Sequence, residues 1–297
     1  MVDKTEIQDW FITLQDAICE QIQNRDGRAK FIEDKWDRAE GGGGRSRVIV
    51  NGNILEKAGV NFSAVWGKTP QNVLKALNLP ESDFFATGVS IVMHPSNPMV
   101  PIIHMNVRYF EMSNGRYWFG GGIDLTPHYV VKDDAQFFHQ QLKKVCDTHN
   151  SNYYPKFKNW ADDYFYIKHR NETRGIGGIF FDHLSENENV NKIQLWEFVK
   201  DVGSIFAPVY GHLMDKNAKL PFNENHKKWQ LLRRGRYVEF NLVYDKGTKF
   251  GLDTNGRTES ILMSMPPEAQ WVYNYKVEPN SEEEKTVSLL KKGIEWA

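Results

Sequence analysis

The sequence has only two cysteines, Cys19 and Cys146, among its 297 residues. They form no Cys-x-x-Cys pair and fall in segments predicted to be helical, which argues against a disulfide framework or a zinc knuckle. Long apolar runs are missing too, and none approaches the length that spans a membrane. The net charge of −1 supplies no overall field for nucleic acid or a membrane surface. Any anionic ligand must therefore be held by local cations.

Common catalytic motifs are also absent. The chain contains no GxGxxG, Walker, HExxH or GxSxG pattern, so nucleotide-binding, zinc-protease and serine-hydrolase functions have no support. The first residues, MVDKTEIQDWF, are acidic and amphipathic, unlike a signal or transit peptide. We therefore expect a cytoplasmic protein with neither nucleic acid nor a membrane as its partner.

Hydrophobic periodicity predicts an α+β fold. We expect one domain, residues 1–297, with a large, mainly antiparallel β-sheet flanked by helices on both sides, because most strands follow one another at hairpin spacing. A glycine-rich stretch at residues 40–45 reads as a loop. Predicted helices cover residues 7–22, 69–77, 133–149, 155–168, 189–214, 223–232 and a segment that Ser281 opens with a capping box. Predicted strands cover residues 31–38, 47–50, 85–93, 102–111, 117–123, 177–181, 237–244 and 259–265, with a turn at 245–247.

The most informative strand is the one at residues 102–110. Ile103, Met105, Val107 and Tyr109 alternate with His104, Asn106, Arg108 and Phe110, and alternate side chains of a strand point to opposite faces of a sheet. The polar face therefore carries a proton-transfer group, an amide and a cation in succession. This composition indicates a functional site.

Two neighbouring segments extend this site. His94-Pro-Ser-Asn-Pro is a rigid corner, and Ser90 shares a face with His94, so both can approach His104 if the two strands pair. A structural, hydrogen-bonded His94 remains the alternative. Three glycines at residues 120–122 lead to Asp124 at the mouth of the same sheet, although Asp124 could instead cap a turn.

Arginines supply possible anion-binding groups, because guanidinium groups bind carboxylates in a bidentate manner. The cluster from Arg233 to Arg236 is best interpreted as solvated surface. His94, His139 and His169 could meet around a divalent metal, but their spacing is not diagnostic. The candidate arginines on or near glycine-rich loops are Arg45, Arg47, Arg170, Arg174 and Arg257.

Five blocks of the chain resemble the oxygen-dependent coproporphyrinogen III oxidase family in the family's order. They are HPSNPMVPIIHMNVRYFE, WFGGGIDLTPHY, DDYFYIKHRNETRGIGGIFFDHL, RRGRYVEFNLVYDKGTKFGL and GRTESILMSMPPEAQW. The resemblance implies oxidative decarboxylation of two propionates of coproporphyrinogen III to vinyl groups, which yields protoporphyrinogen IX in haem biosynthesis. It implies dioxygen as the oxidant and no organic or haem cofactor.

The resemblance also assigns residues. His104 matches the family's proposed proton donor, and Asp124 matches an acidic residue thought to contact or deprotonate pyrrole N–H groups. Arg108 is expected to act with them and to bind a propionate. The positions that match the family's substrate-binding residues are Ser90, Asn106, Val107, Arg108, Asn255, Gly256 and Arg257.

Three further expectations concern the assembly. The resemblance implies a homodimer whose interface includes the segment from Tyr237 to Tyr273, and it makes His94, His139 and His169 possible divalent-metal ligands. We also expect residues 41–47 to form a lid over the site. Two alternatives stay open at this point: a tetrapyrrole carrier without turnover, and a metal-dependent carboxylyase acting on another polycarboxylate.

Overall fold

A seven-stranded antiparallel sheet forms the centre of the computed structural model, which describes residues 2–69, 74, 81–253 and 256–297. The strand order is β1-β2-β3-β4-β5-β6-β9, and every neighbouring pair is antiparallel. The strands are β1 (Ile32–Asp37), β2 (Gly42–Val50), β3 (Leu55–Lys68), β4 (Asp83–Pro95), β5 (Ile102–Met112), β6 (Tyr117–Thr126) and β9 (Gly178–Leu184), with a separate pair β7 (Tyr166–Ile167) and β8 (Glu172–Thr173). The predicted sheet is confirmed.

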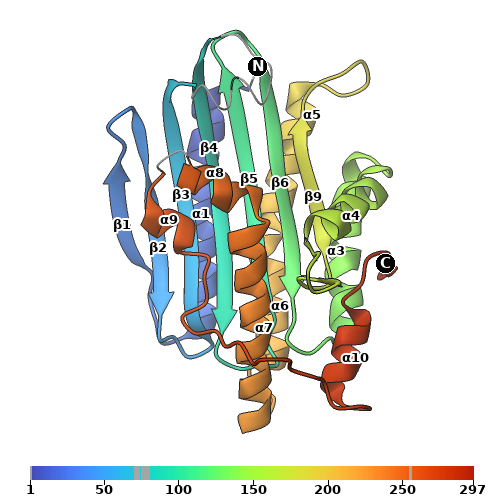
Figure 1. The fold of residues 1–297 in the computed structure, drawn as a ribbon. Coiled ribbons are helices and arrows are strands. Elements are labelled where there is room, and N and C mark those ends of the chain that lie inside the picture. Colours follow the sequence, from blue (N-terminus) through green and yellow to red (C-terminus); the bar gives the residue numbers. More distant parts are fainter. Residues whose placement is uncertain (1, 70–73, 75–80, 254–255) are drawn as a thin grey trace.

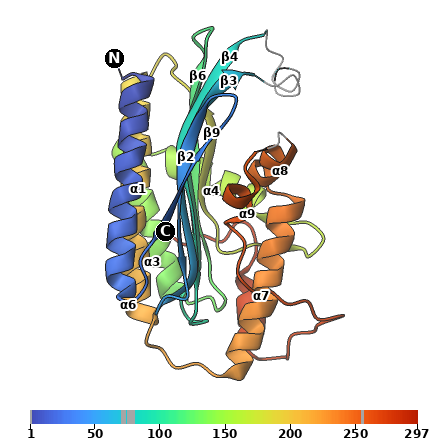
Figure 2. The same ribbon diagram turned by 90° about the vertical axis from the view of Figure 1, so that its left-hand side faces the viewer.

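Helices cover both faces of the sheet, as predicted (Figures 1 and 2). Helices α1, α3 and α6 lie on one side, which we call the core face, and α7, α8 and α9 lie on the other side, which we call the polar face. Helix α4 packs along β9 at the end of the sheet (Figure 1). The helices are α1 (Lys4–Asp26), α3 (Lys132–His149), α4 (Tyr153–Tyr164), α5 (Lys192–Ser204), α6 (Phe206–Asn217), α7 (Glu224–Val243), α8 (Lys246–Asp253), α9 (Thr258–Leu262) and α10 (Glu282–Leu289).

Helix α1 follows directly from its sequence. The side chain of Asp3 accepts hydrogen bonds from the backbone N–H groups of Thr5 and Glu6, which satisfies donors that the first turn leaves free. The helix ends at Gly27, whose φ of 72° is the left-handed conformation that glycine adopts without penalty. Its buried residues recur every three or four positions, so one stripe of the helix packs on the core face.

The two sides of β5 differ as the alternation predicts. Met105, Val107 and Tyr109 are completely buried among the helices of the core face. His104, Asn106, Arg108 and Phe110 are half-buried on the polar face. The strand therefore separates an apolar core from a surface that a ligand can reach.

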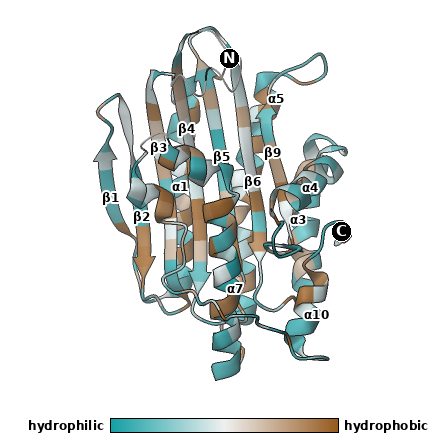
Figure 3. Cartoon of the chain, in the orientation of Figure 1, coloured by the Kyte–Doolittle hydropathy of each residue, from teal (hydrophilic) through white to brown (hydrophobic). Residues whose placement is uncertain are grey.

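The prediction for residues 237–244 was wrong, because this segment belongs to helix α7 rather than to a strand. Its buried side includes Gln230, Arg234 and Asn241, so polar residues interrupt the helical stripe that periodicity would detect. Figure 3 shows the same mixture, with hydrophilic turns of α7 between hydrophobic ones. The predicted turn at 245–247 opens helix α8, where the Asp245 carboxylate accepts the backbone N–H of Thr248 at 2.7 Å. Residues 259–265, predicted as a strand, contain helix α9 instead.

The glycine-rich stretch was also misread. Residues 42–47 are not a loop or a lid but the first part of β2, which pairs with β1 and β3 on its two sides. A Cβ on Gly44 would lie 2.5 Å from the Trp36 ring, so glycine lets Trp36 lie flat on the strand. Strand β3 was not predicted, although its alternating Ala58, Val60 and Phe62 are a recognisable strand signal.

The helix predicted at residues 189–214 is two helices, α5 and α6. They meet at Ile205, three residues before Pro208, whose ring nitrogen cannot donate the N–H that would continue one helix. Most of the predicted helix at 69–77 lies outside the described residues. Cys19 and Cys146 are buried free thiols in α1 and α3, as expected. Among the described residues, no helix is both long and apolar enough to cross a membrane.

Candidate active site

Register places the predicted site residues side by side on the polar face. Ser90 of β4 pairs with Asn106 of β5, and His104 of β5 pairs with Asp124 of β6. Asp124 therefore lies within a strand, so it does not cap a turn. Arg108, two residues after Asn106 on β5, pairs with Gly120 of β6. These pairings bring the histidine, amide and cation predicted from β5 next to the carboxylate predicted from β6.

His104 and Asp124 form a hydrogen-bonded dyad. His104 Nδ1 lies 2.8 Å from Asp124 Oδ1, and Arg174 Nη2 donates to the second oxygen, Oδ2, at 2.7 Å. The side chains of Asp124 and Arg174 are each 2% exposed, whereas that of His104 is 21% exposed. The dyad therefore runs from a sealed carboxylate to an imidazole at the edge of the open surface.

Aromatic rings and an amide from several elements enclose Arg174. Its guanidinium carbon lies 4.4 Å from the ring centroid of Phe165 and 4.7 Å from those of Tyr237 and Phe240. Nη1 donates to the Asn241 side-chain oxygen at 2.7 Å. Cation–π contacts of this kind partly replace the water that a buried guanidinium loses. The sequence marks Arg174 as a possible ligand-binding cation, but its burial makes it a partner for Asp124 instead.

This environment keeps Asp124 ionised. Burial would raise the pKa of its carboxyl, but the charge of Arg174 and the hydrogen bond with His104 outweigh burial and hold the pKa below its usual value. An ionised Asp124 accepts a hydrogen bond from His104 Nδ1, which favours the tautomer with a proton on Nδ1 and leaves Nε2 for a ligand. Both oxygens of Asp124 are engaged, so in this conformation it contacts His104 and Arg174 and does not face the open surface.

Arg108 is an accessible cation on β5. Its side chain is 36% exposed, and it is held by two groups on the polar face. Nη1 donates to Asn106 Oδ1 at 2.7 Å, and Nη2 lies 2.9 Å from Asp182 Oδ1 on β9. Asp182 was not among the predicted site residues. Its position at the end of the strand pattern in GIFFDHL was the only available signal.

Arg257 lies over the other end of the polar face. It pairs with Asp34 of β1, and its Nη1 donates to Ser260 Oγ at 3.0 Å. Ser46 of β2 is a third neighbour, at 3.4 Å from Nη1. Strands β2 and β5 are three spacings of roughly 4.8 Å apart, so the strand that Arg257 contacts through Ser46 lies about 14 Å from the strand that carries Arg108. Gly256 is exposed beside Arg257, and Asn255 lies outside the described residues.

A row of small polar side chains connects these two cations. Ser46 of β2 pairs with Asn61 of β3, Asn61 pairs with Ser90 of β4, and Ser90 pairs with Asn106 of β5. Ser46 Oγ donates to Asn61 Oδ1 at 2.7 Å. Ser90 and Asn106 were predicted, but Ser46 and Asn61 were missed because β3 was not recognised as a strand.

Several predicted cations and one predicted contact do not reach this surface. Val107 is fully buried on the core face, so its side chain takes no part in a site on the polar face. Arg45 and Arg47 bind Asp16 of α1 at 3.0 and 2.7 Å, also on the core side. Arg170 binds Glu239 through two hydrogen bonds of 2.8 and 2.6 Å.

The prediction that the cluster from Arg233 to Arg236 is solvated surface was wrong, because these arginines are buried. Arg233 donates to Glu172 at 2.8 Å, and Arg234, which is fully buried, donates to Glu56 at 2.6 Å and to the Pro95 carbonyl. Arg233 therefore attaches α7 to β8, and Arg234 attaches α7 to the ends of β3 and β4. The cluster holds the helix that covers Arg174.

The three histidines predicted as metal ligands occupy separate places. His94 is fully buried under α7, with Nε2 2.8 Å from the Ser264 carbonyl, and burial lowers its pKa to about 3. His139 is on α3, on the other side of the sheet, and both its ring nitrogens are hydrogen bonded. His169 contacts Tyr244 and Glu239. Within the described part of the chain, no three His, Cys, Asp or Glu side chains are arranged to hold a metal ion, so the metal site stays a prediction without geometric support.

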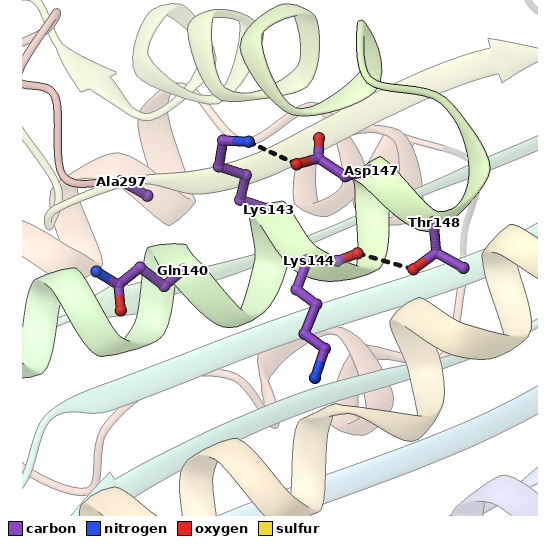
Figure 4. A pocket seen from close by; sticks show the side chains of 6 residues that line it. All are labelled: Gln140, Lys143, Lys144, Asp147, Thr148 and Ala297. Atoms are coloured by element: carbon purple, nitrogen blue, oxygen red, sulfur yellow. Dashed lines mark hydrogen bonds and ion pairs between the residues drawn. The ribbon is translucent and has the colours of Figure 1, made fainter.

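A pocket on α3 is unrelated to these residues. Lys143, Lys144 and Asp147 line it together with the C-terminal Ala297 (Figure 4), and Lys143 pairs with Asp147. Helix α3 covers the core face, so this pocket and His104 lie on opposite sides of the sheet. Its groups are an ordinary i,i+4 ion pair on a helix surface.

Comparison with known proteins agrees with the site. The family model described as coproporphyrinogen III oxidase matches residues 6–296. An oxygen-dependent coproporphyrinogen-III oxidase of Prochlorococcus marinus (strain MIT 9312) is 47% identical over 96% of this chain and 90% of its own length. Coproporphyrinogen-III oxidase 1, chloroplastic, of Arabidopsis thaliana is 47% identical over 95% of this chain and 76% of its own. The chain therefore belongs to the coproporphyrinogen III oxidase family.

Proposed function

We propose that this protein is an oxygen-dependent coproporphyrinogen III oxidase that converts two propionate side chains of coproporphyrinogen III to vinyl groups, giving protoporphyrinogen IX. The names of its relatives support this reaction. The single structural observation that carries the proposal is the His104–Asp124–Arg174 chain beside the half-exposed Arg108. It puts a proton-transfer group and a carboxylate-binding group on one face of β5, four residues apart.

The chemistry needs an electron sink but no flavin. Each step removes CO₂, two electrons and one proton from one ionised propionate, and dioxygen accepts the two electrons together with that proton and a second one from solvent to form hydrogen peroxide. The electron-rich porphyrinogen itself can pass electrons to dioxygen. The protein then has to orient the macrocycle, fix its carboxylates and move protons.

We assign proton transfer to His104. Asp124 fixes the ring and the Nδ1–H tautomer, so we assign Nε2 as the nitrogen that exchanges the proton. A carboxylate on Nδ1 also stabilises the imidazolium that forms when Nε2 takes a proton. Asp124 is therefore a positioning residue for His104, not a group that meets the pyrrole N–H directly.

Arg108 and Arg257 are assigned to substrate carboxylates. Guanidinium groups bind carboxylates with charge-assisted hydrogen bonds, and these two lie at separate places on one face. Ser90 and Asn106, between them, offer hydrogen-bonding groups beneath a flat ring. Asn255 and Gly256 precede Arg257 in the chain and belong to the same proposed subsite.

The test is conversion of coproporphyrinogen III in aerobic and anaerobic samples, followed by porphyrin fluorescence after oxidation. We expect protoporphyrin from the aerobic sample only. Binding without any oxygen-dependent conversion would contradict the oxidase and favour a tetrapyrrole carrier.

We also propose that the reaction needs no organic or haem cofactor, with dioxygen as co-substrate, while a divalent metal is left to experiment. The experiment is to deplete the protein of metal with a chelator, confirm the depletion by elemental analysis, and measure turnover. Full activity of the metal-free protein would exclude a metal-dependent reaction. Activity that is lost and returns with one divalent ion would instead support a metal-dependent decarboxylation.

A homodimer with an interface between Tyr237 and Tyr273 is a further proposal. Apolar side chains exposed in this range support it, since large apolar patches on a monomer commonly mark interfaces. Sedimentation velocity should find a dimer, and Leu242→Glu should shift it toward monomer; a stable wild-type monomer would contradict the proposal. The exposed residues are Leu242, Val243, Phe250, Leu252, Trp271, Val272 and Tyr273.

We propose that the protein is located in the cytoplasm, as bacterial relatives such as that of Prochlorococcus marinus suggest. The plant relatives are named as chloroplastic, so relatives of this chain differ in location. Cell fractionation with an antibody to this chain is the test, and recovery in an organelle fraction would contradict the proposal.

A further inference from the structure

Arg108 is held from both sides before any ligand arrives. Asn106 Oδ1 accepts from Nη1 at 2.7 Å, and Asp182 Oδ1 lies 2.9 Å from Nη2. A guanidinium has five N–H donors, so two such bonds leave donors for a substrate carboxylate. The side chain is 36% exposed, so a ligand can reach these remaining donors.

The chain makes specific room for the contact between Arg108 and Asp182. The two residues are on β5 and β9, and β6 runs between those strands. They meet above Gly120, where an added Cβ would lie 2.6 Å from Asp182 Oδ1 and 2.7 Å from Arg108 Nη2. Any larger residue at position 120 would therefore press on both partners. One glycine of the GGG segment thus has a defined purpose.

Asp182 is itself fixed in place. Its Oδ1 accepts the backbone N–H of His183 at 2.9 Å, and His183 has a left-handed φ of 49°. The His183 ring packs 5.0 Å from the Trp118 ring on β6. An uncommon backbone conformation and a ring contact therefore hold the carboxylate where Arg108 can reach it.

We propose that Asp182 is a positioning residue for substrate binding, which orients Arg108 toward a carboxylate of the tetrapyrrole. The inference rests on the proposed function and names a residue beyond those assigned there. A free arginine side chain loses rotamer entropy when it binds a ligand, and orienting it in advance lowers that cost. The ion pair is too exposed to contribute much to folding, because pairs in water are worth little.

The experiment compares Asp182→Ala with Asp182→Asn. Asparagine keeps the side-chain oxygen that accepts from Arg108 and from the His183 N–H, whereas alanine removes it. We expect Asp182→Ala to raise KM for coproporphyrinogen III about tenfold, equivalent to about 1.4 kcal/mol, with kcat within about twofold of wild type. Asp182→Asn should stay within about threefold of wild type in both constants. Asp147→Asn, in an exposed ion pair of α3, is the matched control.

Two results would overturn the proposal. An unchanged KM in Asp182→Ala would mean that Asp182 has no role in substrate binding, and a lowered KM would mean that Asp182 competes with the substrate carboxylate for Arg108. An equal rise in Asp182→Asn would mean that charge, not orientation, is what Asp182 supplies. The dissociation constant of coproporphyrin III, measured by fluorescence quenching, should follow the same order. This binding measurement needs no turnover, so it tests the role of Asp182 separately from the oxidase activity. The oxidase activity is tested by turnover of the wild-type protein.

Gly120→Ala is a second, independent variant. Its new methyl should separate Asp182 from Arg108 while both side chains remain, and the φ of residue 120 is not in the left-handed region that disfavours alanine. We expect a rise in KM similar to that of Asp182→Ala, with an unchanged thermal midpoint. A wild-type KM in a folded Gly120→Ala protein would also overturn the proposal.

Discussion

Two aspartate–arginine pairs on the same face of the sheet differ in what surrounds them. Asp124 and Arg174 are 2% exposed, lie 2.7 Å apart and are covered by aromatic rings, including two from α7. Asp182 and Arg108 lie 2.9 Å apart and are 25% and 36% exposed. The buried pair holds one ionisation state and one geometry, and the open pair keeps donors for a ligand.

The physical consequences of the two pairs differ accordingly. Removing one partner of a buried ion pair leaves a charge without water or counter-ion and commonly costs about 3–5 kcal/mol. An exposed pair contributes about 0–1 kcal/mol, since water replaces either partner. His104 lies between these regimes, because one nitrogen contacts the buried carboxylate and the ring reaches the open surface.

The largest effect on turnover is expected for His104, which contacts the buried pair and reaches the open surface. His104→Gln removes the proposed proton-transfer group and should lower kcat about 10²–10⁴-fold. Folding should change little, because the side chain is already partly exposed. Single-turnover kinetics with a thermal melt is the measurement. A variant that keeps near-normal kcat would exclude His104 as the proton-transfer group.

A smaller effect is expected in the open pair. Arg108→Ala removes charge-assisted hydrogen bonds to a substrate carboxylate, and bonds to charged groups are worth about 1.5–3 kcal/mol. The value of kcat/KM should fall about 10- to 150-fold, with a near-normal unfolding free energy. Arg116→Ala, on the exposed hairpin between β5 and β6, is a control. An Arg108→Ala protein that is unfolded would make Arg108 a structural residue.

A separate effect is expected in the response of the buried region to acid. His128 is fully buried, and burial, with the charge of Arg234, holds its pKa well below the usual 6.5; burial likewise lowers the pKa of His94 to about 3 and of His139 to about 4. Such a histidine takes up a proton after unfolding but not before. Below pH 6.5 each therefore lowers the unfolding free energy by about 1.4 kcal/mol per pH unit, until the folded pKa is reached.

Urea titrations at pH 7.0, 6.0 and 5.5 measure this response. Stability should be nearly constant above pH 6.5 and fall below it, and His128→Asn should show a shallower slope. An equal slope in that variant would mean that His128 is protonated in the folded protein. The lowered pKa of Asp124 acts in the same direction at still lower pH, because protonating this carboxylate weakens its pairing with Arg174.

Local sequence patterns predicted the part of the site that lies on strands. The alternation from Ile102 to Phe110 correctly separates the two faces of β5, and the strands predicted at residues 102–111 and 117–123 are β5 and β6. From those two strands the neighbourhood of His104 and Asp124 follows. Register alone then brings Ser90 next to Asn106.

The parts that sequence missed depend on distant segments. Helix α7 has charged residues on its buried side, so its period was hidden and its middle was read as a strand. When α7 is not recognised as a helix, no sequence pattern indicates that aromatic rings surround Arg174 or that Asp124 is buried. Asp182 likewise becomes visible only when β9 pairs with β6, because it is far from Arg108 in the chain.

The most direct test of the comparison is the same substitution in both pairs. Asp124→Asn and Asp182→Asn each replace a carboxylate with an amide of equal shape, and urea unfolding at pH 7.5 measures their unfolding free energies. We predict a loss of about 3–5 kcal/mol for Asp124→Asn and less than about 1 kcal/mol for Asp182→Asn. Equal losses of unfolding free energy in the two variants would contradict the distinction between a structural pair, Asp124–Arg174, and a ligand-binding pair, Asp182–Arg108.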